Sequence, residues 1–149
     1  MTRTVLAETE IEIARPRAEV AAYASDPDNA TTWYRNIKGV EWESTPPLAV
    51  GSRIAFVATF LGRRLAYTYV VRELVPGERF VMSTDQGPFP METTYTWADL
   101  SGGGTRMTLR NQGQPQPFAG LTAPVIESSI RRANRGDLRR LKAVLERGA

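Results

Sequence analysis

Residues 124–146, PVIESSIRRANRGDLRRLKAVLE, carry the longest helical pattern in the chain. The apolar residues recur at helical spacing, as Ile130, Ala133, Leu138, Leu141 and Leu145. Five arginines occupy the other side of the same helix: Arg131, Arg132, Arg135, Arg139 and Arg140. At 1.5 Å per residue this helix is about 35 Å long, so it can cover one face of a large sheet.

The segments at the start of the chain predict a strand followed by two short helices. Residues 4–13, TVLAETEIEI, alternate apolar residues with glutamates, which is typical of a half-buried strand. Pro16 suits the first position of a helix, and Asp26 followed by Pro27 marks the start of a second helix. The apolar side of that second helix is predicted to consist of Ala30, Trp33 and Ile37.

From about residue 39 the chain keeps a period of two through six segments, which predicts an antiparallel meander with one apolar face. Turn signals separate these segments: PP at 46–47, LGRR at 61–64, PG at 76–77, QGPFP at 86–90 and SGGG at 101–104. An apolar sheet face needs cover, and the C-terminal helix is the element large enough to provide it. The predicted fold class is α+β. It consists of a curved seven-stranded antiparallel sheet, two short helices after the first strand, and the long helix packed across the sheet.

The order of these elements resembles the helix-grip fold of the SRPBCC superfamily, which includes START domains, the birch-pollen allergen family and the polyketide cyclase/dehydrase family. The resemblance rests on five stretches: RPRAEVAAYASDPDNATTW (15–33), VGSRIAF (50–56), VVRELVPGERFVM (70–82), GGGTRMTL (102–109) and DLRRLKAVLE (137–146). It covers nearly the whole chain, so residues 1–149 are expected to form one ligand-binding domain. It implies a deep cavity between sheet and helix, where members of the superfamily bind lipids, sterols, hormones or polyketide intermediates.

Composition limits the chemistry that this chain can perform. The 149 residues include no cysteine and no histidine, which excludes disulfides, thiolate nucleophiles and catalysis of the Ser-His-Asp type. Any reaction must use carboxylates, tyrosines, arginines or amides, and we expect neither a metal nor a cofactor. The N-terminal 16 residues have no continuous apolar segment, so we expect no membrane span and a cytoplasmic location.

Several side chains are predicted to line the cavity. Small or polar residues on the inward face leave space that larger apolar side chains would fill: Ala7, Thr9, Ala58, Thr93 and Asn111. The candidate ligand-binding residues are Trp33, Phe56, Tyr67, Tyr69, Tyr95, Trp97, Asn111, Ile126, Ile130 and Asn134. Asn134 falls on the buried stripe of the helix, where an asparagine needs a hydrogen-bond partner such as a ligand carbonyl.

Two residues are candidates for catalysis. Glu127 is the carboxylate nearest the inward stripe of the helix, and burial would raise its pKa enough for a general acid or base. Tyr69 is placed to donate a hydrogen bond to a substrate carbonyl. The same residues also fit a structural interpretation, in which the tyrosines pack along the sheet, Trp33 anchors the second helix and Glu127 faces solvent.

Three functions remain open at this stage. The leading hypothesis is the binding of a small hydrophobic molecule, which is aromatic, lipid-like or polyketide-like. The second is a cofactor-free cyclase or dehydratase that uses the same cavity. The third is an interaction module that uses the arginine face, although no aromatic residues interleave with the arginines and we expect no nucleic-acid partner. A monomer and a homodimer are both compatible with the sequence.

Overall fold

The computed structural model describes residues 4–87, 90–114 and 121–147. Its strands are β1 (Val5–Ile13), β2 (Ile37–Trp42), β3 (Arg53–Phe60), β4 (Arg63–Val75), β5 (Arg79–Gln86), β6 (Met91–Asp99) and β7 (Thr105–Gly113). Its helices are α1 (Arg17–Ser25), α2 (Ala30–Trp33) and α3 (Ala123–Arg147), and a 3-10 turn, η1 (Pro27–Asn29), precedes α2.

The seven strands form one antiparallel sheet with the order β1-β7-β6-β5-β4-β3-β2. The predicted fold class is therefore confirmed, and α3 lies within one residue of its predicted bounds at each end. The predicted turn at 86–90 and the connection before α3 include residues 88–89 and 115–120, which lie outside the described residues.

One detail of the second helix was predicted wrongly. Ile37 does not extend its apolar side but begins β2, because the helix ends at Trp33 and Tyr34 takes an extended backbone conformation. Asp26 and Pro27 begin the 3-10 turn η1, and α2 follows from Ala30. The carboxylate of Asp26 accepts a hydrogen bond from the backbone N–H of Asp28 at 3.0 Å.

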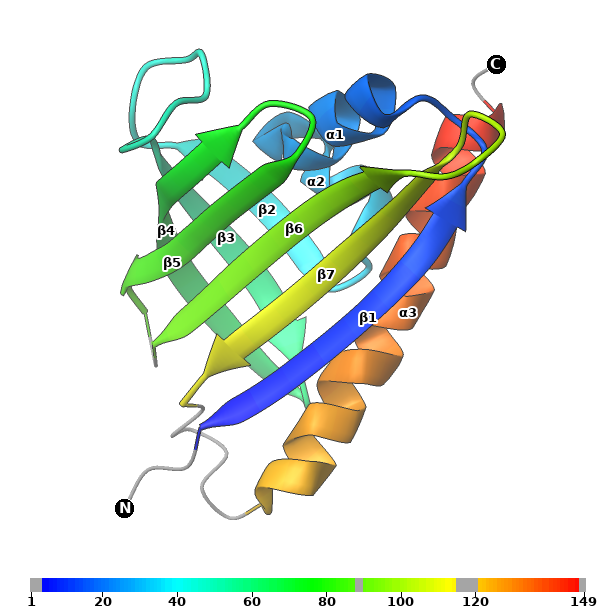
Figure 1. The fold of residues 1–149 in the computed structure, drawn as a ribbon. Helices are drawn as coiled ribbons and strands as arrows, with labels where there is room; N and C mark the ends of the chain where they lie inside the picture. Colours follow the sequence, from blue (N-terminus) through cyan, green and yellow to red (C-terminus); the bar gives the residue numbers. More distant parts are fainter. Residues whose placement is uncertain (1–3, 88–89, 115–120, 148–149) are drawn as a thin grey trace.

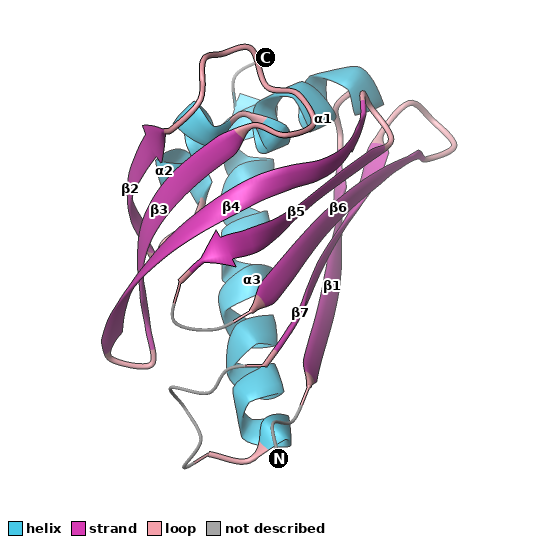
Figure 2. Ribbon diagram, turned by 90° about the vertical axis from the view of Figure 1, so that its left-hand side faces the viewer, coloured by secondary structure: helices cyan, strands magenta, loops and turns pink. Residues whose placement is uncertain are grey.

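The long helix covers the curled sheet from one edge. Figures 1 and 2 show α3 running beside β1 on the inner side of the sheet, while α1 and α2 close one end. Side chains of α3 bind the outer backbone groups of the edge strand β1 and the residue after it. Glu127 Oε2 accepts from Leu6 N at 2.9 Å, and Glu146 Oε2 accepts from Ala14 N at 2.8 Å. Lys142 Nζ donates to Glu12 O at 2.8 Å. These bonds satisfy groups that an open sheet edge would leave unpaired.

The core consists of two clusters of buried side chains. The larger lies toward α1 and α2 and includes Val20, Trp33, Met107, Leu138 and Leu141. The smaller includes Val5, Ala7, Leu65, Ile126 and Ile130, toward the start of α3. The sheet therefore meets the helices closely at two places along α3 and not continuously between them.

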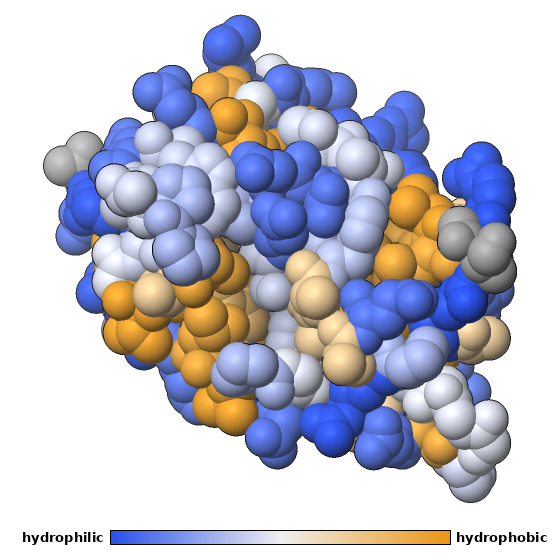
Figure 3. Space-filling model, turned by 90° about the horizontal axis from the view of Figure 1, so that it is seen from above, coloured by the Kyte–Doolittle hydropathy of each residue, from blue (hydrophilic) through white to orange (hydrophobic). Residues whose placement is uncertain are grey.

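On the face of the molecule drawn in Figure 3, the apolar residues are not gathered into one continuous surface. Hydrophobic residues there form separate patches between hydrophilic ones. None of the helices in the described part of the chain is both long enough and apolar enough to cross a membrane.

Gly136 offers a direct test of helix energetics in α3. A Cβ built at this position meets no atom within 4 Å apart from the helix itself. We expect Gly136→Ala to raise the free energy of unfolding by about 1 kcal/mol, because alanine loses less backbone entropy in a helix. Urea denaturation monitored by circular dichroism measures the change.

Gly62 provides the matched control. Its Cβ would also meet open space, but its φ of +77° lies in the left-handed region. Gly62→Ala should lower stability by about 1 kcal/mol, because an L side chain is strained there. A loss of stability in Gly136→Ala would contradict the helix argument.

Candidate functional site

A cavity of about 160 Å³ lies between the inner face of the sheet and α3. Its wall is mostly apolar and aromatic, with Ile54, Phe56, Ala58, Leu65, Tyr67, Tyr69, Phe80, Met82, Met91 and Tyr95 from the sheet. Helical residues complete it, including Ala24, Ala30, Ile130 and Ala133. Because this wall draws on both core clusters, the cavity lies where the two clusters separate.

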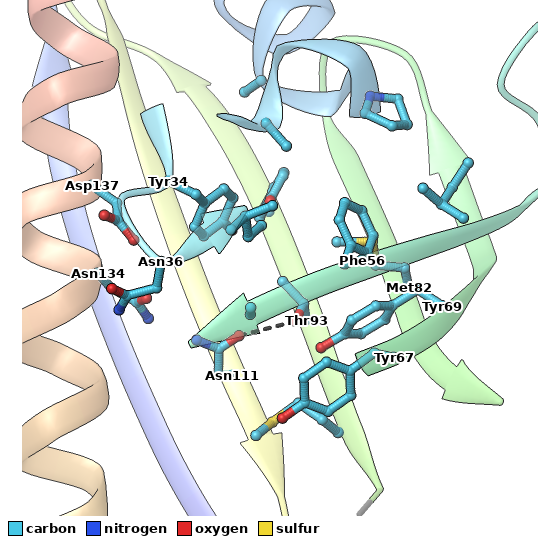
Figure 4. A pocket seen from close by; sticks show the side chains of 18 of the residues that line it. Tyr34, Asn36, Phe56, Tyr67, Tyr69, Met82, Thr93, Asn111, Asn134 and Asp137 are labelled. Carbon is cyan, nitrogen blue, oxygen red and sulfur yellow. Dashed lines mark hydrogen bonds between the residues drawn. The ribbon is translucent and has the colours of Figure 1, made fainter. Parts of the chain in front are cut away.

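Short side chains on the inward face explain why a hollow exists there. Ala58 on β3, Thr93 on β6 and Asn111 on β7 all line the cavity, as their inward positions predicted. None of them is a large apolar side chain that would fill the space between the sheet and α3. Large aromatic rings surround the remaining space, and Figure 4 shows several of them projecting into it.

The two tyrosines of β4 both face the cavity. Their ring centroids are 5.9 Å apart, and Tyr69 also makes an edge contact with Phe56 at 5.6 Å. Burial raises the pKa of Tyr69 to about 12, although a hydrogen bond with Thr93 opposes part of that increase. Burial also raises the pKa of Tyr67. Both phenols are therefore neutral at physiological pH and retain their protons for hydrogen bonding.

A second pair of tyrosines connects the helical end to the sheet. The hydroxyls of Tyr34, directly after α2, and Tyr95, on β6, lie 2.5 Å apart. Burial raises the pKa of each hydroxyl. The Tyr95 ring also contacts Trp33 and Phe80 at centroid distances of 5.8 and 5.5 Å. The hydrogen bond between these two neutral hydroxyls joins the residue after α2 to β6 at the wall of the cavity.

Asp137 is the buried carboxyl group of the site, with 3% of its surface exposed. Its Oδ1 accepts from the backbone N–H of Arg35 at 3.0 Å and from Arg140 Nη1 at 3.2 Å. Arg140 Nη1 also donates to the carbonyl of Trp33 at 2.6 Å. Burial raises the pKa of Asp137, and the two arginine contacts offset part of the effect. Asp137 thus ties α3 to the segment that connects α2 and β2.

Three amide side chains complete the polar part of the wall. Asn134 lies on α3 one turn before Asp137, and Asn36 lies in the α2–β2 connection. Asn111 on β7 uses its Oδ1 to accept from the Thr93 hydroxyl at 3.0 Å. The cavity therefore combines an apolar lining with a few polar groups, which is the usual composition of a small-molecule site.

The structure places seven of the predicted ligand-binding residues together on this wall: Phe56, Tyr67, Tyr69, Tyr95, Asn111, Ile130 and Asn134. Whether they bind a ligand remains a prediction. Ile126 is not among the lining residues. It lies one turn before Ile130 on α3 and is buried in the smaller core cluster.

Glu127, one of the two residues predicted to be catalytic, does not have the predicted inward orientation. Its carboxylate points to the edge of the sheet, where it accepts from Leu6 N, and it is not part of the cavity wall. Glu127 lies at the edge of the buried stripe of α3. At such a position a small rotation of the helix decides whether the side chain faces the cavity or the edge strand. The carboxyl that α3 does direct to the cavity is Asp137.

The two predicted tryptophans also lie outside the lining. Trp33 is fully buried and packs on Tyr34 with ring centroids 4.0 Å apart, so it anchors α2 as the structural interpretation proposed. Trp97 has the predicted inward orientation but lies farther along β6, next to Met107 in the larger core cluster. Its position along the strand, and not its face, removes it from the cavity.

Sequence reasoning missed Tyr34, Asn36 and Asp137. Asp137 was detectable, because it lies three residues after Asn134 and four before Leu141, on the same stripe of the helix. Tyr34 and Asn36 lie in a short connection without any period, where no pattern predicts an orientation. Among the described residues, no group of three or more acidic side chains comes together as a metal site.

A curled antiparallel sheet closed by a long C-terminal helix over an internal cavity defines the helix-grip class of proteins. Residues 4–146 match the family described as polyketide cyclase / dehydrase and lipid transport, and the chain belongs to this family. The resemblance to the SRPBCC superfamily is thereby confirmed. No curated protein matches the sequence.

Solved structures with the same fold come from several bacteria. A START superfamily protein from Mycobacterium smegmatis has 14% identity and a TM-score of 0.82, with 97% of this chain and 99% of that chain covered. A protein from Thermus thermophilus has 19% identity, a TM-score of 0.81 and the same coverage. The Zhui aromatase/cyclase from Streptomyces sp. R1128 has 16% identity and a TM-score of 0.77, with 97% and 95% covered. At these identities the similarity establishes the fold alone.

The raised pKa of Asp137 predicts a specific dependence of stability on pH. The ordinary pKa is 3.8, and the folded protein holds this proton more tightly than the unfolded chain does. This contribution to stability is fully present below the unfolded pKa and is lost as the pH rises through the higher folded pKa. The stability of the wild type relative to Asp137→Asn should therefore increase between about pH 7 and about pH 4.

Urea denaturation at several pH values measures this difference. Glu41→Gln is a suitable control, because it removes an exposed carboxyl group from β2. If the difference in stability between the wild type and Asp137→Asn stays constant, or decreases toward acid pH, burial is not the main influence on the pKa of Asp137.

Proposed function

We propose that this protein binds a small apolar, aromatic molecule in the cavity between the sheet and α3. The observation that carries this proposal is the lining, in which aromatic and aliphatic side chains from several strands and α3 surround an internal space. Removing an apolar ligand from water into such a space is favourable by roughly 25 cal/mol per Å² of buried apolar surface.

The size of the cavity narrows the ligand class. An apolar protein cavity of about 150 Å³ is large enough to bind benzene. The present cavity of about 160 Å³ therefore accommodates a single-ring molecule without rearrangement. A lipid-like or polyketide-like ligand is larger than this cavity, so its binding would require the wall to move.

The family supports the same class of ligand. Its description joins polyketide cyclase and dehydrase activity with lipid transport, and these activities all involve largely apolar molecules. The Zhui structure, which has the same fold, is named as an aromatase/cyclase. Neither comparison identifies the ligand of this chain, so the proposal rests on the lining and on its dimensions.

A cofactor-free cyclase or dehydratase is the second candidate. Two observations favour it: the Tyr69 phenol and the Asp137 carboxyl group both line the cavity, and burial raises the pKa of each. In this hypothesis Asp137 replaces Glu127 as the acid or base. Catalysis requires proton transfer by these groups, whereas binding requires only the space and its lining.

The arginine face of α3 remains the third hypothesis. Arg140 is engaged within the protein, because it binds Asp137 and the carbonyl of Trp33. Arg132, Arg135 and Arg139 are exposed on the outer side of the helix, as their spacing predicted. This arrangement fits a solvated helix face as well as it fits a docking surface.

Titration with toluene tests the binding proposal. We expect toluene to shift the NMR signals of cavity residues and to raise the melting temperature, because a ligand that binds only the native state stabilises it. Ala58→Leu fills part of the cavity and should weaken toluene binding by about tenfold or more.

Ala55→Leu is the matched control, since Ala55 lies on the same strand but on the opposite face of the sheet. It should leave the affinity unchanged. The proposal fails if toluene perturbs no cavity residue, or if the two leucine variants bind it equally well.

A further inference from the structure

We propose that the ligand of this cavity carries a neutral carbonyl group, whose oxygen accepts hydrogen bonds from the side-chain amides of Asn134 and Asn111. This inference rests on the proposed function, because it requires a ligand in the cavity. It adds the chemical class of that ligand, an aromatic ketone, aldehyde or similar carbonyl compound, and the residues that recognise it.

Asn134 is the first of the two donors. It has 5% of its surface exposed, and it lines the cavity from the buried stripe of α3. Its Nδ2 is completely buried and has no hydrogen-bond partner among the described residues. An amide donor that is removed from water without a partner costs free energy, so native proteins nearly always satisfy such groups. An acceptor inside the cavity would satisfy this one.

Asn111 is the second donor, and it approaches from the opposite wall. Its Oδ1 accepts the hydrogen bond from Thr93, which orients the amide so that Nδ2 is the end that can donate to a ligand. Figure 4 shows the nitrogen end of Asn111 directed toward α3, on the side where Asn134 lies. A carbonyl oxygen has two lone pairs and can accept from both amides at once.

The charges around the cavity favour a neutral acceptor over an anion. The described lining contains no lysine or arginine, and its carboxyl groups are those of Asp26 and Asp137. A carboxylate ligand would enter an apolar space without a counter-charge, with the Asp137 carboxyl group on the same helix as Asn134. A ketone or aldehyde accepts the same hydrogen bonds without that cost.

Water is the competing occupant, because a cavity of this size holds ordered water next to polar groups. The two possibilities differ in their effect on ligand preference. If the amides bind only water, an apolar ligand and its carbonyl analogue bind about equally well. If the amides recognise a carbonyl, the analogue that lacks it leaves both donors unpaired.

A matched pair of ligands tests the proposal. Acetophenone and ethylbenzene have the same skeleton and differ by one carbonyl oxygen. We expect acetophenone to bind the wild type about tenfold more tightly than ethylbenzene, measured by NMR titration or calorimetry. We expect benzoate, which carries the same ring and a negative charge, to bind more weakly than acetophenone.

Two variants test whether Asn134 causes the preference for acetophenone over ethylbenzene. Asn134→Leu removes the donor and keeps a side chain of similar size, so the preference for acetophenone should fall to about twofold while ethylbenzene still binds. Gln112→Leu removes an exposed amide from the outer face of β7 and should leave the preference unchanged. The wild type alone provides a further measurement. In NMR spectra, acetophenone should shift the side-chain amide signals of Asn111 and Asn134 more than ethylbenzene does.

The outcomes separate this inference from the proposed function. Equal affinity for acetophenone and ethylbenzene in the wild type, or a preference that survives in Asn134→Leu, overturns the carbonyl proposal and leaves apolar binding intact. If benzoate binds more tightly than acetophenone, the proposal that the ligand is neutral is wrong. Failure of every probe to bind overturns both proposals.

Discussion

Side chains of α3 attach the helix to both sides of the curled sheet, and this attachment determines how the other elements enclose the cavity. On one side, Glu127, Lys142 and Glu146 bind backbone groups of the β1 edge and of the residue that follows it. On the other side, Asp137 binds the backbone of Arg35, between α2 and β2, and Arg140 binds the carbonyl of Trp33, the last residue of α2. Each bond satisfies a backbone group that the sheet or helix leaves open. The helix is therefore held at its margins and does not have to pack flat on the middle strands.

The hollow follows from this attachment and from side-chain length. The central strands present Ala58, Thr93 and Asn111 toward α3, and these side chains leave a gap that the surrounding aromatic rings do not close. Burial keeps the phenols of the lining neutral, as the raised pKa of Tyr69 illustrates. The cavity thus offers an apolar interior with uncharged donors, and its main charged group, Asp137, is engaged in closing the wall. This lining agrees with the proposed binding of a neutral molecule.

The same wall connects stability with access to the cavity. The contacts of Asp137 and Arg140 hold the α2–β2 connection against α3, and Tyr34 in that connection is bonded to Tyr95. Tyr34, Tyr95 and Asp137 also line the cavity, so these bonds border the space that the proposed ligand would occupy. The residues that join α3 to the α2–β2 connection therefore also shape the cavity, which links the local stability of this wall to the shape of the site.

Sequence patterns were sufficient to predict the element order, the faces of the strands and the bounds of α3, because periods of two and 3.6 residues follow from backbone geometry. They also predicted the inward orientation of Tyr67, Tyr69 and Asn134. Which inward positions border the hollow depends on tertiary packing: Trp97 points inward but lies beyond the cavity, and Glu127 binds the sheet edge. Periodicity defines the face of an element, but depth along it and hydrogen bonds to distant segments depend on how the elements pack.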